Sequence, residues 1–290
     1  MGKISKALNK VAPPPGSHLN PPVEYHESQD LRSKAEKTTT TVQPSITHPP
    51  SPTETSTDKW DERLLDASKN YSGVAESFRK LRTMILHPES GNPARTIMTL
   101  SSDPQEGKSF VCANLGISLA HSVEQQALMI DCDLRRPSLQ GLFGLKHPKG
   151  LTNYLRDGDN VADLIYPTGL PKLSIIPSGP PPDNPSELLS SDKMSLLIKE
   201  LTQMYDDRLI LLDTPPFHAA SETLVLSQLV DKFVVVVRWG KSGRENVKKM
   251  IDQIGREKVI GVVFNAFEMN ILDRKIQGVG YHNYYSESYY

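Results

Sequence analysis

The 290-residue sequence predicts an α/β domain built on a doubly wound, mostly parallel sheet. Apolar, β-prone runs alternate with amphipathic segments, a pattern typical of strands that are covered by helices on both faces. Buried strands are expected at residues 96–101, 127–131, 172–176, 208–213, 233–238 and 259–265, and helices at 73–86, from 108 onward, 184–189, 192–205, 221–229 and 243–255.

The second observation behind this fold is the turn after the first strand, which leads into a helix opening on Gly107-Lys108-Ser109. Here backbone N–H groups and the helix dipole converge on one point, as in phosphate-binding loops. We expect Gly107 to let the backbone approach phosphates, Lys108 to reach the β- and γ-phosphates, and Ser109 to place its hydroxyl on Mg²⁺. Ser102 stands where the common pattern has Gly, so an ordinary turn with a surface lysine is the alternative.

Polar residues end three other strands on the same side of the expected sheet. Asp131 and Asp133 close one strand, Asp213 closes another, and the carboxyl ends of parallel strands meet at one edge. Carboxylates brought together repel one another unless a cation lies between them, and Mg²⁺ prefers such oxygen ligands. Asn265 ends the last strand and is a candidate for reading the adenine. Asp131, Asp133 and Asn265 also have a plainer interpretation as polar turn residues, and Asp213 taken alone is a weak signal.

The expected helix 73–86 carries an apolar stripe of Phe78, Leu81 and Ile85. Glu76, Arg79 and Arg82 recur every third residue along another face. They form either a solvated charged face or a subunit contact, since Arg pairs well with carboxylates across interfaces.

Composition divides the chain into four segments. Residues 1–11 are expected to form a short basic amphipathic segment, either frayed or a docking peptide. Residues 12–57 are rich in Pro, Ser and Thr and predict a disordered linker. Residues 58–280 form the expected nucleotide-binding domain. Residues 281–290 predict a flexible tail that holds half of the ten tyrosines, namely Tyr281, Tyr284, Tyr285, Tyr289 and Tyr290. Phenols with nothing to pack against, attached to such a domain, suggest phosphate acceptors.

Charge and motifs exclude several classes of function. With 33 basic and 34 acidic residues the net charge is −1, and no basic stripe suggests nucleic-acid binding. No apolar run is long enough to span a bilayer, and we expect no signal peptide. The eight histidines lack metal-ligand spacing, and Cys112 and Cys132 are expected to be buried thiols.

Taken in order, the motifs resemble those of the bacterial tyrosine kinases (BY-kinases) of polysaccharide co-polymerase systems, in particular the cytoplasmic capsule and exopolysaccharide autokinases. The resemblance covers about residues 70–290. It rests on an oligomerisation helix at 76–83, Walker A at 101–109, Walker A′ at 130–137, Walker B at 211–216, further family segments at 150–155 and 176–189, and the tyrosine cluster. It implies a P-loop NTPase fold of the deviant Walker, MinD-like type. Gln105 and Glu222 stand where the family usually has Gly and Asp.

The resemblance implies an ATP-dependent protein-tyrosine autokinase, a transferase that uses ATP and Mg²⁺. Catalysis is expected from Lys108, Asp131, Asp133 and Asp213, with Asp131 orienting the phenol and aiding its deprotonation. Metal contacts are expected from Ser109, Asp133 and Asp213. The nucleotide site is expected to comprise Asp103, Pro104, Gln105, Glu106, Gly107, Lys108, Ser109, Phe110 and Asn265.

The resemblance also implies partners and a place in the cell. Copies are expected to form a ring, an octamer by resemblance, through Glu76, Arg79 and Arg82, so that one tail enters a neighbour's site. A membrane-bound chain-length determinant is expected to activate the kinase, and a tyrosine phosphatase to reverse the reaction. The chain would then be cytoplasmic, held at the inner face of the cell membrane by its partner, and would regulate polysaccharide polymerisation and export.

Two other functions fit parts of the sequence. A MinD- or ParA-like ATPase switch shares the fold, but such proteins usually carry an additional lysine early in the loop, and 101–106 contain none. They also lack a tyrosine tail. A scaffold that binds nucleotide without catalysis is supported by Gln105 alone.

Overall fold

A computed structural model describes residues 57–68, 73–89, 91–146, 148–205 and 207–266. The predicted N-terminal segment, nearly all of the predicted linker and the tyrosine tail lie outside the described residues. Within the described part of the chain, no helix combines the length and the apolar character needed to cross a membrane.

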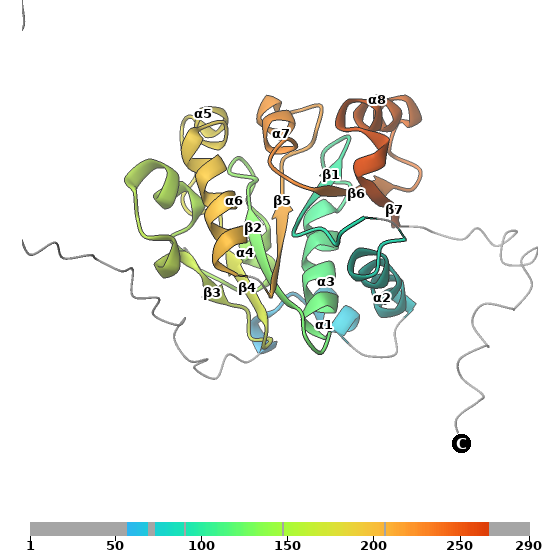
Figure 1. Cartoon of the computed structure of the whole chain (residues 1–290), viewed down its shortest axis with the longest axis horizontal. Coiled ribbons are helices and arrows are strands. Elements are labelled where there is room, and N and C mark those ends of the chain that lie inside the picture. The colour runs from blue at the N-terminus through green and yellow to red at the C-terminus, as the bar shows by residue number, and fades with distance from the viewer. Residues whose placement is uncertain (1–56, 69–72, 90, 147, 206, 267–290) are drawn as a thin grey trace, which may run out of the picture. The chain divides into compact units, whose positions relative to one another are not determined.

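A seven-stranded sheet in the order β3-β4-β2-β5-β1-β6-β7 forms the centre of the domain (Figure 1). All neighbouring strands are parallel except β3 and β4. The strands are β1 (Thr96–Ser101), β2 (Gln126–Asp131), β3 (Tyr166–Pro167), β4 (Leu173–Ile176), β5 (Arg208–Asp213), β6 (Lys232–Arg238) and β7 (Val259–Asn265). The predicted parallel α/β sheet is therefore confirmed, with a short antiparallel strand added at one edge.

Helices cover the sheet on both faces. On one face lie α1 (Glu62–Ser68), α2 (Gly73–Leu86), α3 (Lys108–Ala120) and α4 (Leu139–Leu142). On the other lie α5 (Pro185–Leu189), α6 (Asp192–Met204), α7 (Ser221–Leu226) and α8 (Arg244–Ile254). Short helical turns, η1 (Thr57–Lys59), η2 (Asn153–Asp157), η3 (Val161–Leu164) and η4 (Arg256–Lys258), complete the described elements.

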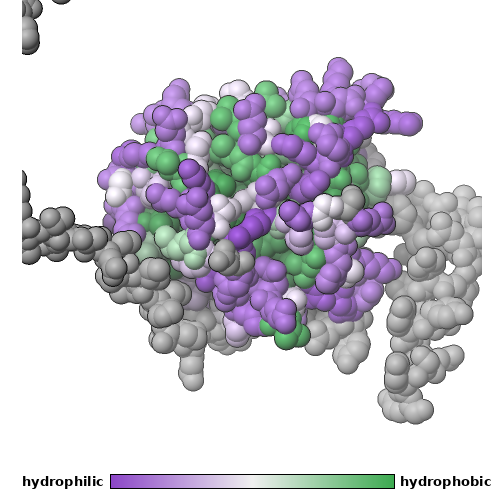
Figure 2. Space-filling model, in the orientation of Figure 1, coloured by the Kyte–Doolittle hydropathy of each residue, from purple (hydrophilic) through white to green (hydrophobic). Residues whose placement is uncertain are grey.

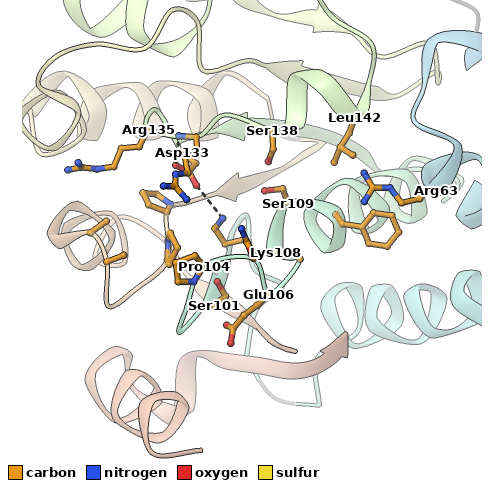
Figure 3. A pocket seen from close by; sticks show the side chains of 18 residues that line it. Arg63, Ser101, Pro104, Glu106, Lys108, Ser109, Asp133, Arg135, Ser138 and Leu142 are labelled. Atoms are coloured by element: carbon orange, nitrogen blue, oxygen red, sulfur yellow. Dashed lines mark hydrogen bonds and ion pairs between the residues drawn. The ribbon is translucent and has the colours of Figure 1, made fainter. Parts of the chain in front are cut away.

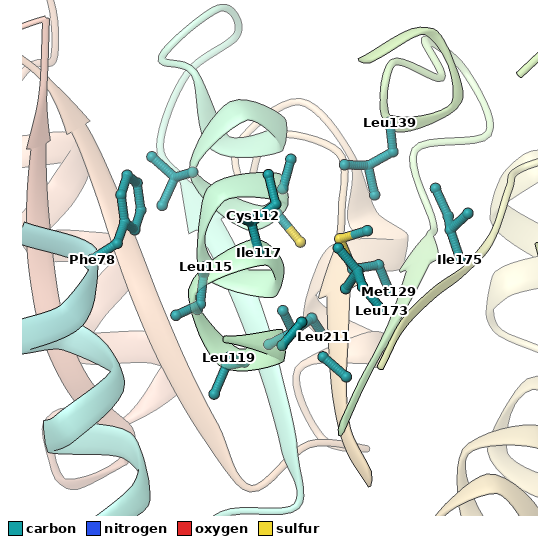
Figure 4. Close-up of a cluster of buried hydrophobic side chains, with 14 of the residues drawn as sticks. Phe78, Cys112, Leu115, Ile117, Leu119, Met129, Leu139, Leu173, Ile175 and Leu211 are labelled. Carbon is teal, nitrogen blue, oxygen red and sulfur yellow. The ribbon is translucent and has the colours of Figure 1, made fainter. Parts of the chain in front are cut away.

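The strands are apolar throughout because each packs against helices on both faces. In β5, Leu211 joins the cluster under α3, whereas Ile210 and Leu212 join the cluster under α6 and α7. Figure 4 shows the first cluster, in which Leu115 and Leu119 of α3 lie near Leu211. Helix α3 is buried along most of its length because α1, α2 and α4 cover its outer side.

Strand β7 does not match the prediction of a buried strand. It forms the edge of the sheet, and Val262 and Phe264 are 42% and 57% exposed. The apolar run gave the correct secondary structure, but burial depends on strand order, which the run does not encode. The Phe264 ring is in edge contact with Trp239, which is also half-exposed.

The segment just before α1 contacts residues at or just after the ends of α4 and β3. The indole N–H of Trp60 donates to the carbonyl of Thr168 at 2.6 Å, and the ring meets Phe143 edge-on. The Asp61 N–H donates to the Leu142 carbonyl at 3.0 Å. These contacts hold α1 beside α4, so that its first turn reaches the edge of the candidate site.

Candidate active site

The loop between β1 and α3 has the left-handed turns that a phosphate loop requires. Gly107 has a φ of 91° and Gln105 a φ of 61°. Gln105 therefore adopts the conformation that glycine would have there, at a strain of about 1 kcal/mol. The loop keeps its turn because its neighbours hold it from outside, with Arg238 Nη1 donating to the Gln105 carbonyl at 3.0 Å.

Glu106 organises the loop from within, a role that the motif pattern did not predict. Its buried carboxylate accepts hydrogen bonds from the Asp103 N–H at 3.2 Å and the Ser102 hydroxyl at 3.3 Å. It also accepts one from the Ser242 hydroxyl, in the segment that follows β6. The Asn265 amide, from the last residue of β7, donates to the Glu106 carbonyl at 2.9 Å. Contacts from β7 and from the segment after β6 therefore fix the loop's shape.

Lys108 points toward Asp133, one of the two carboxylates predicted to share its site (Figure 3). Its ammonium lies 3.4 Å from Asp133 Oδ2 and 3.9 Å from Asp213 Oδ1, and its side chain is only 10% exposed. Burial alone would lower the pKa of Lys108, but the nearby aspartates outweigh it and raise that pKa. Lys108 is therefore a fixed cation at the N-terminus of α3.

Asp213 is a buried carboxylate that is short of partners. Neither of its oxygens accepts a hydrogen bond of good geometry from the described residues, and burial raises its pKa against the opposing effects of Lys108 and the nearby Ser109 hydroxyl. An unsatisfied carboxylate at the edge of a phosphate loop suits a hard cation with oxygen ligands. No three His, Cys, Asp or Glu side chains in the described chain are arranged to hold a metal ion unaided. Magnesium held here would therefore need ligands from phosphate and water as well, as is usual for it.

Asp131 lies beside Asp213 in the sheet register but faces the backbone. Its carboxylate accepts from the N–H groups of Asp133, Ser138 and Leu139 at 3.1, 3.2 and 3.1 Å. The side chain is fully buried, and burial followed by repulsion from Asp213 and Asp133 raises its pKa. In this structure Asp131 shapes the loop after β2, and Asp133 is the carboxylate of that loop that lines the pocket.

A pocket around these groups has a volume of about 470 Å³. It is lined by the loop residues Pro104 to Phe110, and also by Asp133, Pro215 and Ala219. Asn265, the predicted base contact, lines a second pocket of about 370 Å³ between α2 and β7. Phe110 lines both pockets, which therefore adjoin at the start of α3.

Several residues in or next to the pocket were not among the predicted site residues. Arg63, from α1, lies at the opposite end of the pocket from Arg135 (Figure 3). Arg135 donates from Nε to Glu222 Oε1 at 2.8 Å, and the Ser186 hydroxyl donates to Glu222 Oε2 at 2.9 Å. The pair ties the loop after β2 to helix α7. Because 87 residues separate Arg135 from Glu222 in the sequence, no local motif predicts this contact.

The three charged residues of α2 do not behave alike. Arg79 pairs with Glu76 within the helix at 2.7 Å, and both side chains are partly exposed. Arg82 Nη1 instead donates to the Ser118 carbonyl in the last turn of α3 at 2.6 Å. A cation at a helix C-terminus is favoured by the dipole, so Arg82 anchors α2 to the core. The five predicted acceptor tyrosines lie outside the described residues.

Known proteins identify the family to which this geometry belongs. No family model matches the chain. The chain is 31% identical over 198 residues to the tyrosine-protein kinase YwqD of Bacillus subtilis, covering 68% of this chain and 82% of YwqD. It is 32% identical over 214 residues to the tyrosine-protein kinase CpsD of Streptococcus agalactiae, covering 73% of this chain and 90% of CpsD.

Solved structures agree with these relatives. The kinase domain of the Escherichia coli tyrosine kinase ETK superposes with a TM-score of 0.64 at 29% identity, covering 71% of this chain and 82% of that domain. The septum site-determining protein MinD of Pyrococcus horikoshii, complexed with Mg-ADP, superposes with a TM-score of 0.50 at 22% identity, covering 59% and 69%. This second likeness extends to the fold alone, that of a deviant Walker P-loop NTPase. The chain belongs to the family of bacterial tyrosine-protein kinases.

Proposed function

We propose that this kinase uses ATP to phosphorylate the tyrosine cluster at its own C-terminus, with the tail of one copy entering the site of another. The observation that carries the proposal is the position of Lys108. It is held at the N-terminus of α3 between Asp133 and Asp213, inside a pocket lined by the phosphate loop. The acceptors would be Tyr281, Tyr284, Tyr285, Tyr289 and Tyr290.

The reaction needs little covalent chemistry from the protein. As the phenol oxygen bonds to the γ-phosphorus, the bond from that phosphorus to the β–γ bridging oxygen breaks and ADP leaves. Lys108 and the loop N–H groups would neutralise the charge on the transferred group. The phenol proton must pass to a carboxylate or to water, because a phenol with a pKa near 10 is neutral at pH 7. The family resemblance assigns the orientation of the phenol to Asp131.

The residues present suit bound magnesium. Asp213 and Asp133, together with the hydroxyl of Ser109, would hold it, and the lack of well-aligned hydrogen bonds to the buried Asp213 oxygens supports this assignment. When bound, the ion would offset the negative charge of the phosphates.

Assembly into a ring would explain exposed groups on two helices. On α2, Val74 and Met84 are about half exposed beside the Glu76–Arg79 pair. Hydrophobic side chains also reach the surface around α7, where Leu224 and Val225 are 44% and 39% exposed (Figure 2). Contacts between copies would remove this apolar area from water. Repulsion among phosphorylated tails would then loosen the ring.

The remaining partners follow from the family. We propose that a membrane-bound chain-length determinant activates the kinase and holds it at the inner face of the cell membrane. A tyrosine phosphatase would restore the tail, and the cycle would regulate capsule or exopolysaccharide polymerisation and export.

Intact mass spectrometry tests the central proposal. The purified chain is incubated with Mg-ATP, with and without the cytoplasmic peptide of the activator. Lys108→Met removes the phosphate-binding cation, and Lys146→Met, an exposed lysine outside the pocket, is the matched control. Phosphates on residues 281–290 that require Lys108 but not Lys146 are the expected result. ATP turnover with an unmodified tail would instead identify a MinD-like switch, and neither event would identify a non-catalytic scaffold.

A further inference from the structure

Four cations line the pocket, and three of them have a carboxylate partner. Arg63 pairs with Asp61 at 2.8 Å, Lys108 with Asp133 at 3.4 Å, and Arg135 with Glu222 at 2.8 Å. The fourth is Arg136, whose side chain is exposed and has no carboxylate partner among the described residues. Its charge is available for an anion that comes from outside.

The backbone around Arg136 is held on both sides by buried carboxylates. The Arg136 N–H donates to Asp133 Oδ1 at 3.1 Å. Two and three residues further on, the N–H groups of Ser138 and Leu139 donate to Asp131. Pro137 lies between these anchors and fixes its own φ. A fixed backbone sets the direction of the Cα–Cβ bond from which the Arg136 side chain extends.

The anion that fits this position differs from the phosphate being transferred. Lys108 already serves that phosphate from the buried end of the pocket, whereas Arg136 is on the exposed side. The acceptor enters from solvent, and its sequence holds tyrosines in adjacent pairs, Tyr284-Tyr285 and Tyr289-Tyr290. Once one member of a pair is modified, its neighbour is presented beside a group of about −1.5 to −2 charges. Arginine matches phosphate oxygens with two parallel hydrogen bonds.

We propose that Arg136 binds a phosphotyrosine adjacent to the tyrosine that is being phosphorylated. The subsite rests on the proposed function and makes a tail that has received its first phosphate a better acceptor than an unmodified one. Arg136 is then a specificity-determining residue, which favours completion of one tail before the next is started.

A peptide pair tests the subsite. The peptide covers residues 280–290, with Tyr284 as its only free tyrosine and the other tyrosines replaced by Phe; position 285 is either phosphotyrosine or Phe. The enzyme is the full chain with its five tail tyrosines changed to Phe, so that its own tail does not compete. Steady-state kinetics gives KM for each peptide, and fluorescence anisotropy gives their affinities for the ADP-bound chain without any need for turnover.

The expected KM and Kd of the phosphorylated peptide are about fivefold lower, the size of one partly exposed charge-assisted pair. In Arg136→Gln the ratio between the two peptides falls to about one, and in Arg136→Lys it lies between. Arg256→Gln, which removes an exposed arginine of η4 paired with Asp252, keeps the wild-type ratio.

Equal KM and Kd for both peptides in the wild type, or a ratio that Arg136→Gln leaves intact, would overturn the proposal. If Arg136→Gln weakened the binding of both peptides equally, the proposal would also be overturned, because Arg136 would then serve the transferred phosphate. These results distinguish failure of the autokinase from failure of the subsite. Absence of phosphate transfer to either peptide in the presence of the activator's cytoplasmic peptide contradicts the autokinase, whereas Arg136-dependent binding of the phosphopeptide supports the subsite independently.

Discussion

Replacement of Gly107 by alanine would test whether Asn265, at the end of the edge strand β7, holds the phosphate loop in place. Gly107 has a φ of 91°, and a Cβ built there would lie 1.9 Å from the Asn265 amide nitrogen. That amide donates to the Glu106 carbonyl at 2.9 Å. Alanine therefore strains the backbone and also displaces Asn265 from its hydrogen bond.

The expected cost follows from these parts. A left-handed alanine costs about 1 kcal/mol or somewhat more, and the lost hydrogen bond costs about 1 kcal/mol. Alanine also lowers the conformational entropy of the unfolded chain, which offsets about 0.5–1 kcal/mol of this cost. We expect Gly107→Ala to lower the free energy of unfolding by about 1–2 kcal/mol. Gly240→Ala is the matched control, because Gly240 has a φ of 70° and no atom within 4 Å of the added Cβ.

Urea unfolding of the full chain measures these differences, and Asn265→Ala completes a double-mutant cycle. Asn265→Ala removes the obstacle, so in that background Gly107→Ala should cost only as much as Gly240→Ala does. An equal cost of Gly107→Ala in both backgrounds would refute the reasoning, because the contact with Asn265 would then contribute nothing.

Three further predictions concern stability without nucleotide. Burial raises the pKa of Asp213 in the folded chain above its unfolded value of about 4. Between these two pKa values the folded chain binds more protons than the unfolded chain does. The free energy of unfolding should therefore fall as the pH rises through the raised pKa. Asp213→Asn should therefore stabilise the chain at pH 8 more than at pH 5 in urea titrations; a loss at pH 8 would contradict this. Trp60→Phe should cost about 2 kcal/mol in the same assay, because the Thr168 carbonyl loses its donor and a void forms; a cost below about 0.5 kcal/mol would show that the indole contact is unimportant. Arg82→Gln should cost about 1 kcal/mol by removing the bond to Ser118, whereas Lys80→Gln, on the exposed side of α2, should be neutral; equal effects would mean that Arg82 acts only as a surface charge.

Local sequence patterns predict much of this fold and the centre of its site. The apolar stripe of Phe78, Leu81 and Ile85 predicts α2 with the same bounds that the structure has. The strand–turn–helix pattern places Lys108 correctly, and strand-end carboxylates predict that Asp133 and Asp213 approach it. These features succeed because each depends on a few consecutive residues and on the rule that parallel strands share an edge.

Features that depend on strand order or on distant partners could not be predicted in this way. Periodicity identifies β7 as a strand but not as the edge, so the exposure of Phe264 was missed. The direction of the Asp131 carboxylate depends on backbone amides of the following loop. The anchoring of Arg82 depends on where α3 ends, and the presence of Arg63 in the pocket depends on how α1 packs.

The strand order also constrains how the enzyme is made. The phosphate loop follows β1 and the Asp131–Asp133 segment follows β2, yet these strands are not neighbours, because β5 lies between them. During synthesis β5 is the last of the three to leave the ribosome. Until it is inserted, β1 and β2 cannot be brought into register, and such non-local pairing is slow. The two loops of the site are therefore brought together only after β5 has been synthesised. A chain that ends before Asp213 lacks both the strand that joins β1 to β2 and one of the two carboxylates beside Lys108.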